Sequence, residues 1–520
     1  MQLTSLDIII VIAYAIGLFL LANWISRSRT GQRRDTADYF LASRNLPWWA
    51  IGASLIAANI SAEQIIGMSG SGYAIGLAIA SYEWMAALTL LIVGKWFLPI
   101  FLENRIYTMP QFLEQRYGTR IRTLMAVFWL ALYIFVNLTS ILWLGSIAVT
   151  TVAGVDQDIA LAVLGLFALL YQLRGGLRAV AMTDIVQVCL LVLGGLTVTG
   201  LALSRIGGEA GVIGGFVTLV ETAPDHFRMI LDKASPYYKD LPGISVLIGG
   251  MWIANLSYFG FNQYIIQRAL AAKSLAEAQH GVVFAAYLKL LMPLIVVLPG
   301  IAAVVLVPDL ARPDEAYPAM MKLLPAGLAG LVFAALIAAI VASTASKINA
   351  VAAIFTLDIY NKIGAPKSEE RLVAVGRISA IASIVLAIVT ARPLLGSFDQ
   401  AFQYIQEYTG FFTPGIVVIF MLGLFWKKAT EAGALAATIG SFALSFLIKI
   451  VWPELPFMDR MSVVFALSLG LAVAFSLLWP AKAATNRIQT ASVRFNTTAV
   501  FNAASVGVML VLVALYATWW

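Results

Sequence analysis

Long apolar runs, each long enough for a helix to cross a bilayer, constrain this chain more than any other feature of its sequence. A transmembrane helix needs about 20 consecutive apolar residues, and we count fourteen candidate segments in the 520 residues. We therefore predict an all-α polytopic membrane protein with 14 transmembrane helices. The candidate segments lie near residues 6–26, 47–72, 78–101, 122–150, 158–173, 177–204, 243–262, 276–306, 326–358, 371–390, 395–425, 430–451, 459–479 and 497–518.

Composition supports a membrane protein and argues against several functions. Hydrophobic residues make up 61% of the chain and charged residues only 12%, whereas soluble domains carry about a quarter charged residues. The single cysteine, Cys189, excludes an internal disulfide and a cysteine-rich metal site. No metal cluster, nucleophile triad, phosphate loop, filter-like repeat or signalling domain is evident. A carrier is therefore favoured over an enzyme, a channel or a sensor.

The net charge of +7 comes from basic loops rather than from a nucleic-acid-binding patch. These loops fall on alternate sides of the predicted helices, and cytoplasmic loops are the ones enriched in Lys and Arg. The pattern predicts a multi-pass protein of a bacterial-type inner (plasma) membrane, with its N- and C-termini outside. The basic loops lie at residues 26–34, 103–122, 174–178, 267–273, 361–372, 426–428 and 480–487.

Polar residues lie deep in only a few of the apolar segments. The second segment carries "AANISAEQIIGMSGSG" and the seventh carries "ANLSYFGFNQY". These two segments are five helices apart, as expected for two inverted halves that each begin with a broken helix. The break signal is weaker in the seventh segment, whose helix could simply end at its asparagines. The alternative is that these polar residues only join neighbouring helices.

Several long stretches resemble the sodium/solute symporter family over nearly the whole chain. They include "SLIAANISAEQIIGMSGSGYAIGLAIASYEW", "FGFNQYIIQRALAAKS", "LPGIAA", "AFQYIQEYTG" and "GLFWKK". The resemblance implies a five-plus-five inverted-repeat (LeuT-like) core with flanking helices, alternating access, and a neutral sugar such as galactose or glucose as the solute. No cofactor is implied other than a sodium ion, and the expected partners are the sugar and the lipid bilayer. The sequence leaves the oligomeric state open.

The same resemblance divides the chain into five parts. An extra N-terminal helix and a basic cytoplasmic loop take residues 1–46, the first repeat 47–205, an outer loop 206–242, the second repeat 243–425, and three additional C-terminal helices 426–520.

The resemblance assigns sugar-binding roles to residues of five segments. Amides both donate and accept hydrogen bonds, a carboxylate accepts and an ammonium donates, so such a set suits sugar hydroxyls. Glu83 and Lys289 are also expected to offset each other's charge, or to be a structural ion pair only. The expected sugar ligands are Asn59, Gln64, Glu83, Asn255, Lys289 and Gln406.

Four large side chains are expected to gate the site. Tyr258 would stack its ring on the sugar as an inner gate, because an aromatic face suits the C–H face of a pyranose. Met68, Tyr82 and Phe402 would form an outer gate. Each of the four could also be ordinary core packing.

The family's sodium site is depleted in this chain. The resemblance places it at the backbone carbonyls of Ala57, Ile60 and Ala339 and at two adjacent hydroxyls. Oxygen ligands are what a hard cation needs, but the hydroxyl pair reads Ala342-Ser343 here, so one ligand is missing.

A lone lysine lies one helical turn beyond this site. Lys347 is the only ionisable residue between Ala326 and Leu357, and it shares a helix face with Ser343. We expect Lys347 to pair with Asp184 and to replace sodium, which would make transport sodium-independent or couple it to protons. Two alternatives stay open: Lys347 extends into a water-filled vestibule with little effect, or a weakened sodium site still works.

A second carrier function also stays open. The solute could instead be inositol, sialic acid or an amino acid, carried with sodium. A carboxylate solute would call for an arginine or an exposed helix N-terminus, and the expected site contains no arginine.

Overall fold

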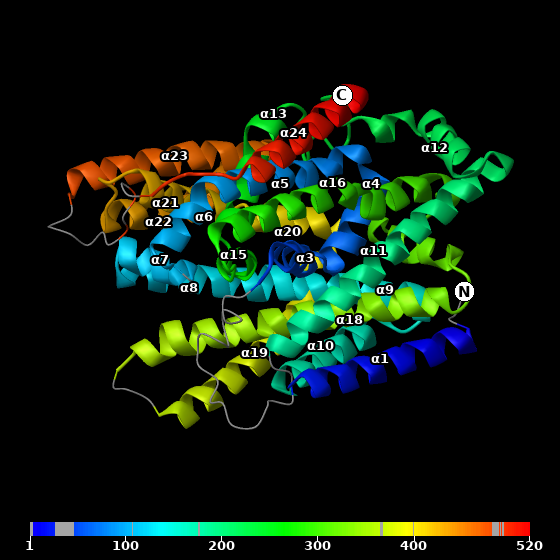
Figure 1. The fold of residues 1–520 in the computed structure, drawn as a ribbon, viewed down its shortest axis with the longest axis horizontal. Coiled ribbons are helices and arrows are strands. Elements are labelled where there is room, and N and C mark those ends of the chain that lie inside the picture. The colour runs from blue at the N-terminus through cyan, green and yellow to red at the C-terminus, as the bar shows by residue number, and fades with distance from the viewer. Residues whose placement is uncertain are drawn as a thin grey trace.

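The computed structural model describes residues 4–26, 46–106, 108–174, 177–364, 368–398, 400–480, 488, 490 and 493–520, with the backbone alone described at 18–26, 173–174, 177–185 and 369. In this part of the chain the regular elements are all helical, and one isolated β-bridge joins Leu46 to Ala272. Long helices run side by side across Figure 1.

The main α-helices are α1 (Ser5–Ser26), α3 (Trp48–Asn59), α4 (Met68–Ala74), α5 (Ser81–Ile92), α6 (Leu98–Glu103), α7 (Met109–Arg116), α8 (Thr119–Ala131), α9 (Thr139–Ala153), α10 (Gln157–Arg174), α11 (Leu177–Gly207), α12 (Gly211–Thr222), α13 (Ser245–Ile248), α14 (Gly250–Asn255), α15 (Gln263–Leu270), α16 (Leu275–Leu306), α17 (Ala316–Met320), α18 (Leu328–Ala353), α19 (Glu369–Leu395), α20 (Ala401–Thr409), α21 (Thr413–Phe425), α22 (Glu431–Val451), α23 (Phe457–Leu478) and α24 (Ala499–Trp519). Five π-helices are η2 (Glu63–Gly67), η4 (Val93–Phe97), η5 (Leu132–Leu138), η8 (Leu256–Phe261) and η11 (Ile354–Ile359).

The described residues contain fewer helices of membrane-spanning length than the fourteen spans predicted. Among the described residues, nine helices are long and apolar enough to cross a membrane, or up to eleven when each of two bent pairs counts as one span. Two shorter apolar helices, Ser5–Gly17 and Gln157–Gln172, match two further predicted segments. The all-α polytopic prediction is confirmed, while the count of fourteen stays a prediction.

The second predicted segment is broken where its polar residues indicate. Helix α3 ends at Asn59, and Ile60 has an extended backbone with φ −72° and ψ 109°. The helices on either side, Trp48–Asn59 and Glu63–Ala74, are bent by 69°. The last carbonyls of α3 therefore have no partner from a continuing helix and can face a ligand or an ion.

The seventh predicted segment, 243–262, consists of short pieces rather than one straight helix. It contains α13, α14 and η8, and it stops at Asn262, whose backbone is extended with φ −83° and ψ 118°. The Asn262 side chain accepts a hydrogen bond from the backbone N–H of Tyr264 at 3.0 Å and so starts α15. The predicted second break thus lies at Asn262.

Helix α16 lies in the middle of the bundle and packs against α3, α4 and α5. It begins with a Ser-x-x-Glu sequence in which the Ser274 hydroxyl accepts from the backbone N–H of Glu277 at 3.3 Å. Most of its length is buried, including Lys289. A lysine in this position must find its partners inside the protein.

Helix α20, which carries the predicted gate residue Phe402, is anchored at its first residue. Asp314, in the loop after α16, accepts a hydrogen bond from the backbone N–H of Ala401 at 2.9 Å. Helices α20 and α21 then bend by 46° at a short break. This arrangement directs Phe402 and Gln406 toward the centre of the molecule, where both line a cavity.

Candidate solute site

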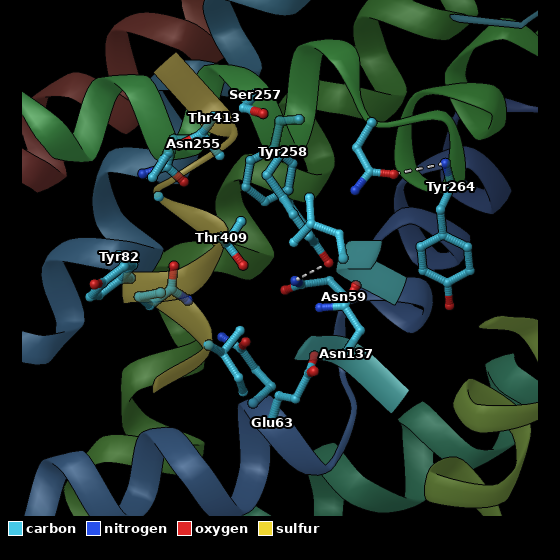
Figure 2. Close-up of a pocket in the computed structure, with 18 of the residues that line it drawn as sticks. Asn59, Glu63, Tyr82, Asn137, Asn255, Ser257, Tyr258, Tyr264, Thr409 and Thr413 are labelled. Atoms are coloured by element: carbon cyan, nitrogen blue, oxygen red, sulfur yellow. Dashed lines mark hydrogen bonds between the residues drawn. The ribbon is translucent and has the colours of Figure 1, made fainter. Parts of the chain in front are cut away.

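A cavity lies where the two broken segments meet, and Figure 2 shows side chains from both turned toward it. Its walls come mainly from η2, α5, η5, η8, α16 and the bend between α20 and α21. The polar and charged residues that line it are Asn59, Glu63, Gln64, Glu83, Asn137, Asn255, Ser257, Asn262, Lys289, Lys347, Gln406, Thr409 and Thr413, and the aromatic residues are Tyr82, Trp129, Tyr133, Tyr258, Phe259, Phe261, Tyr264 and Phe402.

Four of the predicted sugar ligands form one hydrogen-bonded cluster on the cavity wall. Lys289 Nζ lies 2.7 Å from Glu83 Oε2 and also donates to Asn59 Oδ1. Gln64 Nε2 donates to the other carboxylate oxygen of Glu83. The Lys289 and Glu83 side chains are 1% and 4% exposed. Because buried charges are costly unless they are paired and hydrogen-bonded, this cluster lets two opposite charges face a solute away from water.

The charges that line the cavity cancel. Among the described residues that line it, two carboxylates, Glu63 and Glu83, balance two ammonium groups, Lys289 and Lys347, and neither arginine nor aspartate is present. A solute with a net charge would meet no surplus of the opposite sign here. The cavity therefore suits a neutral solute that offers several donors and acceptors.

Tyr258 connects the two broken segments at the wall of the cavity. Asn59, the last residue of α3, donates to the Tyr258 hydroxyl at 3.2 Å, the contact drawn in Figure 2. The same asparagine accepts from Lys289, so the predicted inner gate is linked directly to the charged cluster.

The three predicted outer-gate residues all line the cavity, and two of them are in contact. The rings of Tyr82 and Phe402 pack edge-to-face with centroids 5.0 Å apart. The Met68 sulfur accepts from Gln64 at 3.6 Å. All three side chains are buried. An aromatic pair of this geometry is favourable yet easy to separate, because it depends on no charged contact.

The other two predicted sugar ligands line the same cavity from other elements. Asn255, at the end of α14, donates to the Met251 carbonyl at 3.1 Å. Gln406 reaches the cavity from α20. All six predicted ligands and all four predicted gate residues thus border one space.

Sequence reasoning missed several residues of the cavity, and many of them lie on π-helices. Glu63 lies on η2, Tyr133 and Asn137 lie on η5, and Ser257 lies on η8. A π-helix is uncommon and often marks a functional site, because its extra residue changes the direction of side chains. The isolated asparagine inside the apolar run 122–150 was a usable signal for η5. Thr409 and Thr413, missed as well, border the bend between α20 and α21.

The residues expected at a sodium site are buried and come from two places, the end of α3 and the helix α18. Ala57, Ile60, Ala339 and Ser343 are at most 7% exposed. The last carbonyls of α3 and the Ser343 hydroxyl are oxygen donors of the kind that a hard cation takes, but Ala342 brings none.

Lys347 lies beside a carboxylate that the sequence analysis did not consider. Its Nζ is 3.4 Å from Glu63 Oε2. The side chain of Asp184 lies outside the described part of the structure, so the pairing of Lys347 with Asp184 stays a prediction. Within the described residues, Glu63 is the acidic partner of Lys347.

Comparisons with known proteins agree with this architecture. A sequence profile described as "Sodium:solute symporter family" matches residues 39–440. The chain is 50% identical over 538 residues to a "Sodium/glucose cotransporter" of Vibrio parahaemolyticus, covering 100% of this chain and 99% of that protein. It is 34% identical to the human "Sodium/myo-inositol cotransporter 2", covering 86% of this chain and 70% of that protein.

Solved structures resemble the fold. A "Na+-coupled sialic acid symporter" in a substrate-bound outward-open state superposes with a TM-score of 0.77 at 21% identity, covering 92% of this chain and 99% of that one. A nucleobase-cation-symport-1 family transporter in a closed conformation superposes with a TM-score of 0.55 at 12% identity, covering 86% and 96%. These likenesses confirm the LeuT-like transporter fold.

Proposed function

The chain belongs to the sodium:solute symporter family, and from this premise we propose that it carries a neutral sugar such as galactose or glucose across the cytoplasmic membrane by alternating access. The observation that carries the proposal is the buried cluster of Asn59, Gln64, Glu83 and Lys289 beside a cavity whose charges cancel.

The cluster matches the chemistry of a sugar. Each sugar hydroxyl both donates and accepts, and the cavity offers amides that do both, a carboxylate that accepts and an ammonium that donates. Tyr258 and Phe259 add aromatic surface beside these groups. Aromatic faces bind the apolar faces of a pyranose ring while the polar groups fix its orientation.

Alternating access would use the two broken segments as its moving parts. We assign residues 47–205 and 243–425 to the two repeats, with 206–242 as the outer loop and residues 1–46 and 426–520 as flanking parts. Asn59, at the first break, touches Tyr258, which lies on η8 just before the second break at Asn262. Opening on the outer side would separate Tyr82 from Phe402, and opening on the inner side would release Tyr258 from Asn59.

We further propose that Lys347 takes the place of a coupling sodium ion. Ala342 removes one oxygen ligand, while Lys347 brings a fixed positive charge to the same helix, α18. Pairing with Asp184 would serve the same purpose, since that carboxylate occupies an acidic position near the family's sodium site. Coupling to sodium, to protons or to no ion gives distinct experimental outcomes.

Inositol is the second candidate solute. It is a neutral polyol, so it would suit the same charge-balanced cavity, and the mammalian relatives at 34% identity are named for it. Sialic acid and amino acids carry a carboxylate, and among the lining residues there is no arginine to bind one.

Uptake into proteoliposomes tests the proposal. Labelled galactose, glucose and myo-inositol would each be offered with and without an inward sodium gradient, at fixed pH. The Glu83→Gln protein serves as the control in which the charged cluster is broken. We expect one sugar to be taken up and to compete with its unlabelled form.

Uptake measured with and without the sodium gradient distinguishes the possible ways in which transport is coupled to an ion. Accumulation only with sodium would mean that the depleted site still works and that Lys347 is peripheral. Uptake indifferent to sodium would support Lys347 as the replacement, and a proton gradient together with Lys347→Met would then separate uniport from proton symport. Absence of uptake of both sugars, with or without uptake of inositol, would contradict the sugar assignment.

A further inference from the structure

A second ion pair lines the cavity apart from the sugar cluster. Lys347 on α18 lies 3.4 Å from Glu63 on η2, and the two side chains are 11% and 16% exposed. Charge-assisted hydrogen bonds are usually about 2.7–2.9 Å long, so this pair is held loosely. It is nevertheless shielded enough that the loss of one partner would leave the other charge poorly solvated.

The Glu63 carboxylate can bind a further group, because Lys347 contacts only one of its two oxygen atoms. Its Oε1 atom is buried and has no hydrogen-bond partner among the described residues. Its Oε2 atom faces both Lys347 Nζ and the Ser61 hydroxyl, which lies 3.5 Å away. A buried carboxylate oxygen without a partner, next to a hydroxyl, is a set of oxygen donors suited to a small cation.

The pair also joins two elements that are separate in sequence. Glu63 is the first residue of η2, just after the break that follows α3, whereas Lys347 belongs to α18. The ion pair attracts the break after α3, which carries Glu63, to α18. Any movement of this break relative to α18 would have to separate the charges of Glu63 and Lys347.

We propose that Glu63, with Ser61, is a monovalent-cation site that the ammonium of Lys347 occupies permanently. The protein thus carries its own cation between the broken segment and α18. The inference deepens the proposed replacement of sodium by Lys347, and it rests on that part of the proposed function. It adds that Lys347 neutralises the charge of Glu63, and that removal of the lysine side chain exposes a binding site for a free monovalent cation.

Thermal unfolding of the purified protein tests this without any solute. Four proteins would be compared in sodium chloride and in choline chloride at equal ionic strength and fixed pH: the unchanged chain, Lys347→Met, Glu63→Gln, and the double variant. Lys322→Met and Glu209→Gln, which alter exposed residues, are matched controls for the loss of one charge.

We expect the unfolding temperature of Lys347→Met alone to rise by several degrees in sodium, once the ion is about a hundredfold above its dissociation constant. The unchanged chain and both variants that carry Glu63→Gln should respond equally in the two salts. The double variant should also unfold at a higher temperature than either single variant, because no unpaired charge remains in it.

Two results would overturn the inference. One is an equal response to sodium in the unchanged chain and in Lys347→Met, which would place any free cation elsewhere. The other is a sodium response of Lys347→Met that persists after Glu63→Gln is added. Since neither readout uses a sugar, failure of the sugar assignment in the uptake experiment leaves this test intact.

Discussion

At the scale of single residues, burying the charge of Lys289 has a high free-energy cost, and this cost determines the cluster of Asn59, Gln64, Glu83 and Lys289. Lys289 lies at the centre of α16 with its side chain only 1% exposed, so its charge has to be met by Glu83 and by the amide oxygen of Asn59. The same groups are the ones that face the cavity. Binding of a solute and stability of the fold therefore depend on the same side chains.

Although solute binding and stability depend on the same side chains, we predict that mutation can separate them. Lys289→Met or Glu83→Gln alone should lower the free energy of unfolding by about 3–5 kcal/mol, the usual cost of breaking a buried pair. The double variant should recover most of that stability yet still fail to bind solute. Thermal unfolding and equilibrium sugar binding, measured on the same preparations, would test this. Recovery of binding in the double variant would contradict a direct role in recognition.

A second residue-scale prediction concerns Asp240 in the outer loop. Burial, together with the nearby carboxylate of Glu407, raises the pKa of Asp240 from 3.8 to about 6. Glu407 itself contacts Lys449 at 2.9 Å and Arg460 at 3.0 Å. The folded chain therefore holds the Asp240 proton more tightly than the unfolded chain does. The stability that this contributes is fully present below pH 3.8 and is lost as the pH rises through about 6.

Asp240→Asn should remove this pH dependence. As the pH rises from 5 to 7.5, the free energy of unfolding of the unchanged protein should fall by more than that of the variant. Unfolding temperatures measured across that range would test the sign. Parallel curves for the two proteins would contradict a raised pKa at this position.

At the scale of elements, the sequence predicted where a helix breaks better than it predicted which helices contain π-helical turns. Asn59, Ser61 and Glu63 are poor residues for a continuous apolar helix, and α3 does end there. Helix-breaking chemistry is local, so it can be read from neighbouring residues. The π-helices cannot be read in this way, because an extra residue in a turn is stabilised by packing from other helices. Asn137 and Tyr133 were therefore missed, whereas Asn59 and Gln64 were assigned through the resemblance and not through local chemistry.

The same limit explains the ion pair of Lys347. The sequence identified the lysine as unusual, because it stands alone in an apolar run. Its partner in the described structure, Glu63, is 284 positions away, and no spacing rule connects residues at that distance. The resemblance directed attention to Asp184 instead. Pairing across a bundle depends on helix packing, which a single sequence does not contain.

One long-range contact at this scale yields a prediction of its own. Asp7 on α1 accepts hydrogen bonds from the backbone N–H groups of Gly327 and Gly330 at 2.7 and 2.8 Å, so it caps α18 from another helix. Asp7→Ala should lower the free energy of unfolding by about 0.5–2 kcal/mol, as the loss of a helix cap does. Asp7→Asn, which keeps an acceptor oxygen, should cost less. Thermal unfolding of both variants measures the difference, and equal losses would contradict the capping role.

At the scale of the whole molecule, the first and last described helices begin and end on one face. Asp7 contacts Gly327 near the start of α1, and the carbonyl of Trp519 accepts from the backbone N–H of Met229 at 2.8 Å. The loops around these contacts are linked through Tyr73, whose carbonyl lies 3.0 Å from His226 Nε2 and whose hydroxyl donates to Pro308. Figure 1 places the N and C labels toward the same end of the helices.

Two basic stretches of the described chain, 103–122 and 426–428, lie together at the end of the bundle away from the start of α1 (Figure 1). Arg116, at the end of α7, donates to the carbonyls of Gly423, Trp426 and Ala429 in the loop that carries Lys427 and Lys428. Because cytoplasmic loops are the basic ones, this face should be cytoplasmic. The face that holds the ends of α1 and α24 should then be external.

This orientation gives a prediction for the intact protein in cells. Alkaline phosphatase folds only outside the cytoplasm and green fluorescent protein is bright only inside it, so a fusion after Trp520 should give phosphatase activity and no fluorescence. Fusions inserted after Lys428, between α21 and α22, should give the reverse. The two insertion points lie on opposite faces, so each is the control for the other. Fluorescence at the C-terminal fusion would invert the orientation, and Tyr82 and Phe402 would then close the cavity toward the cytoplasm rather than toward the outside.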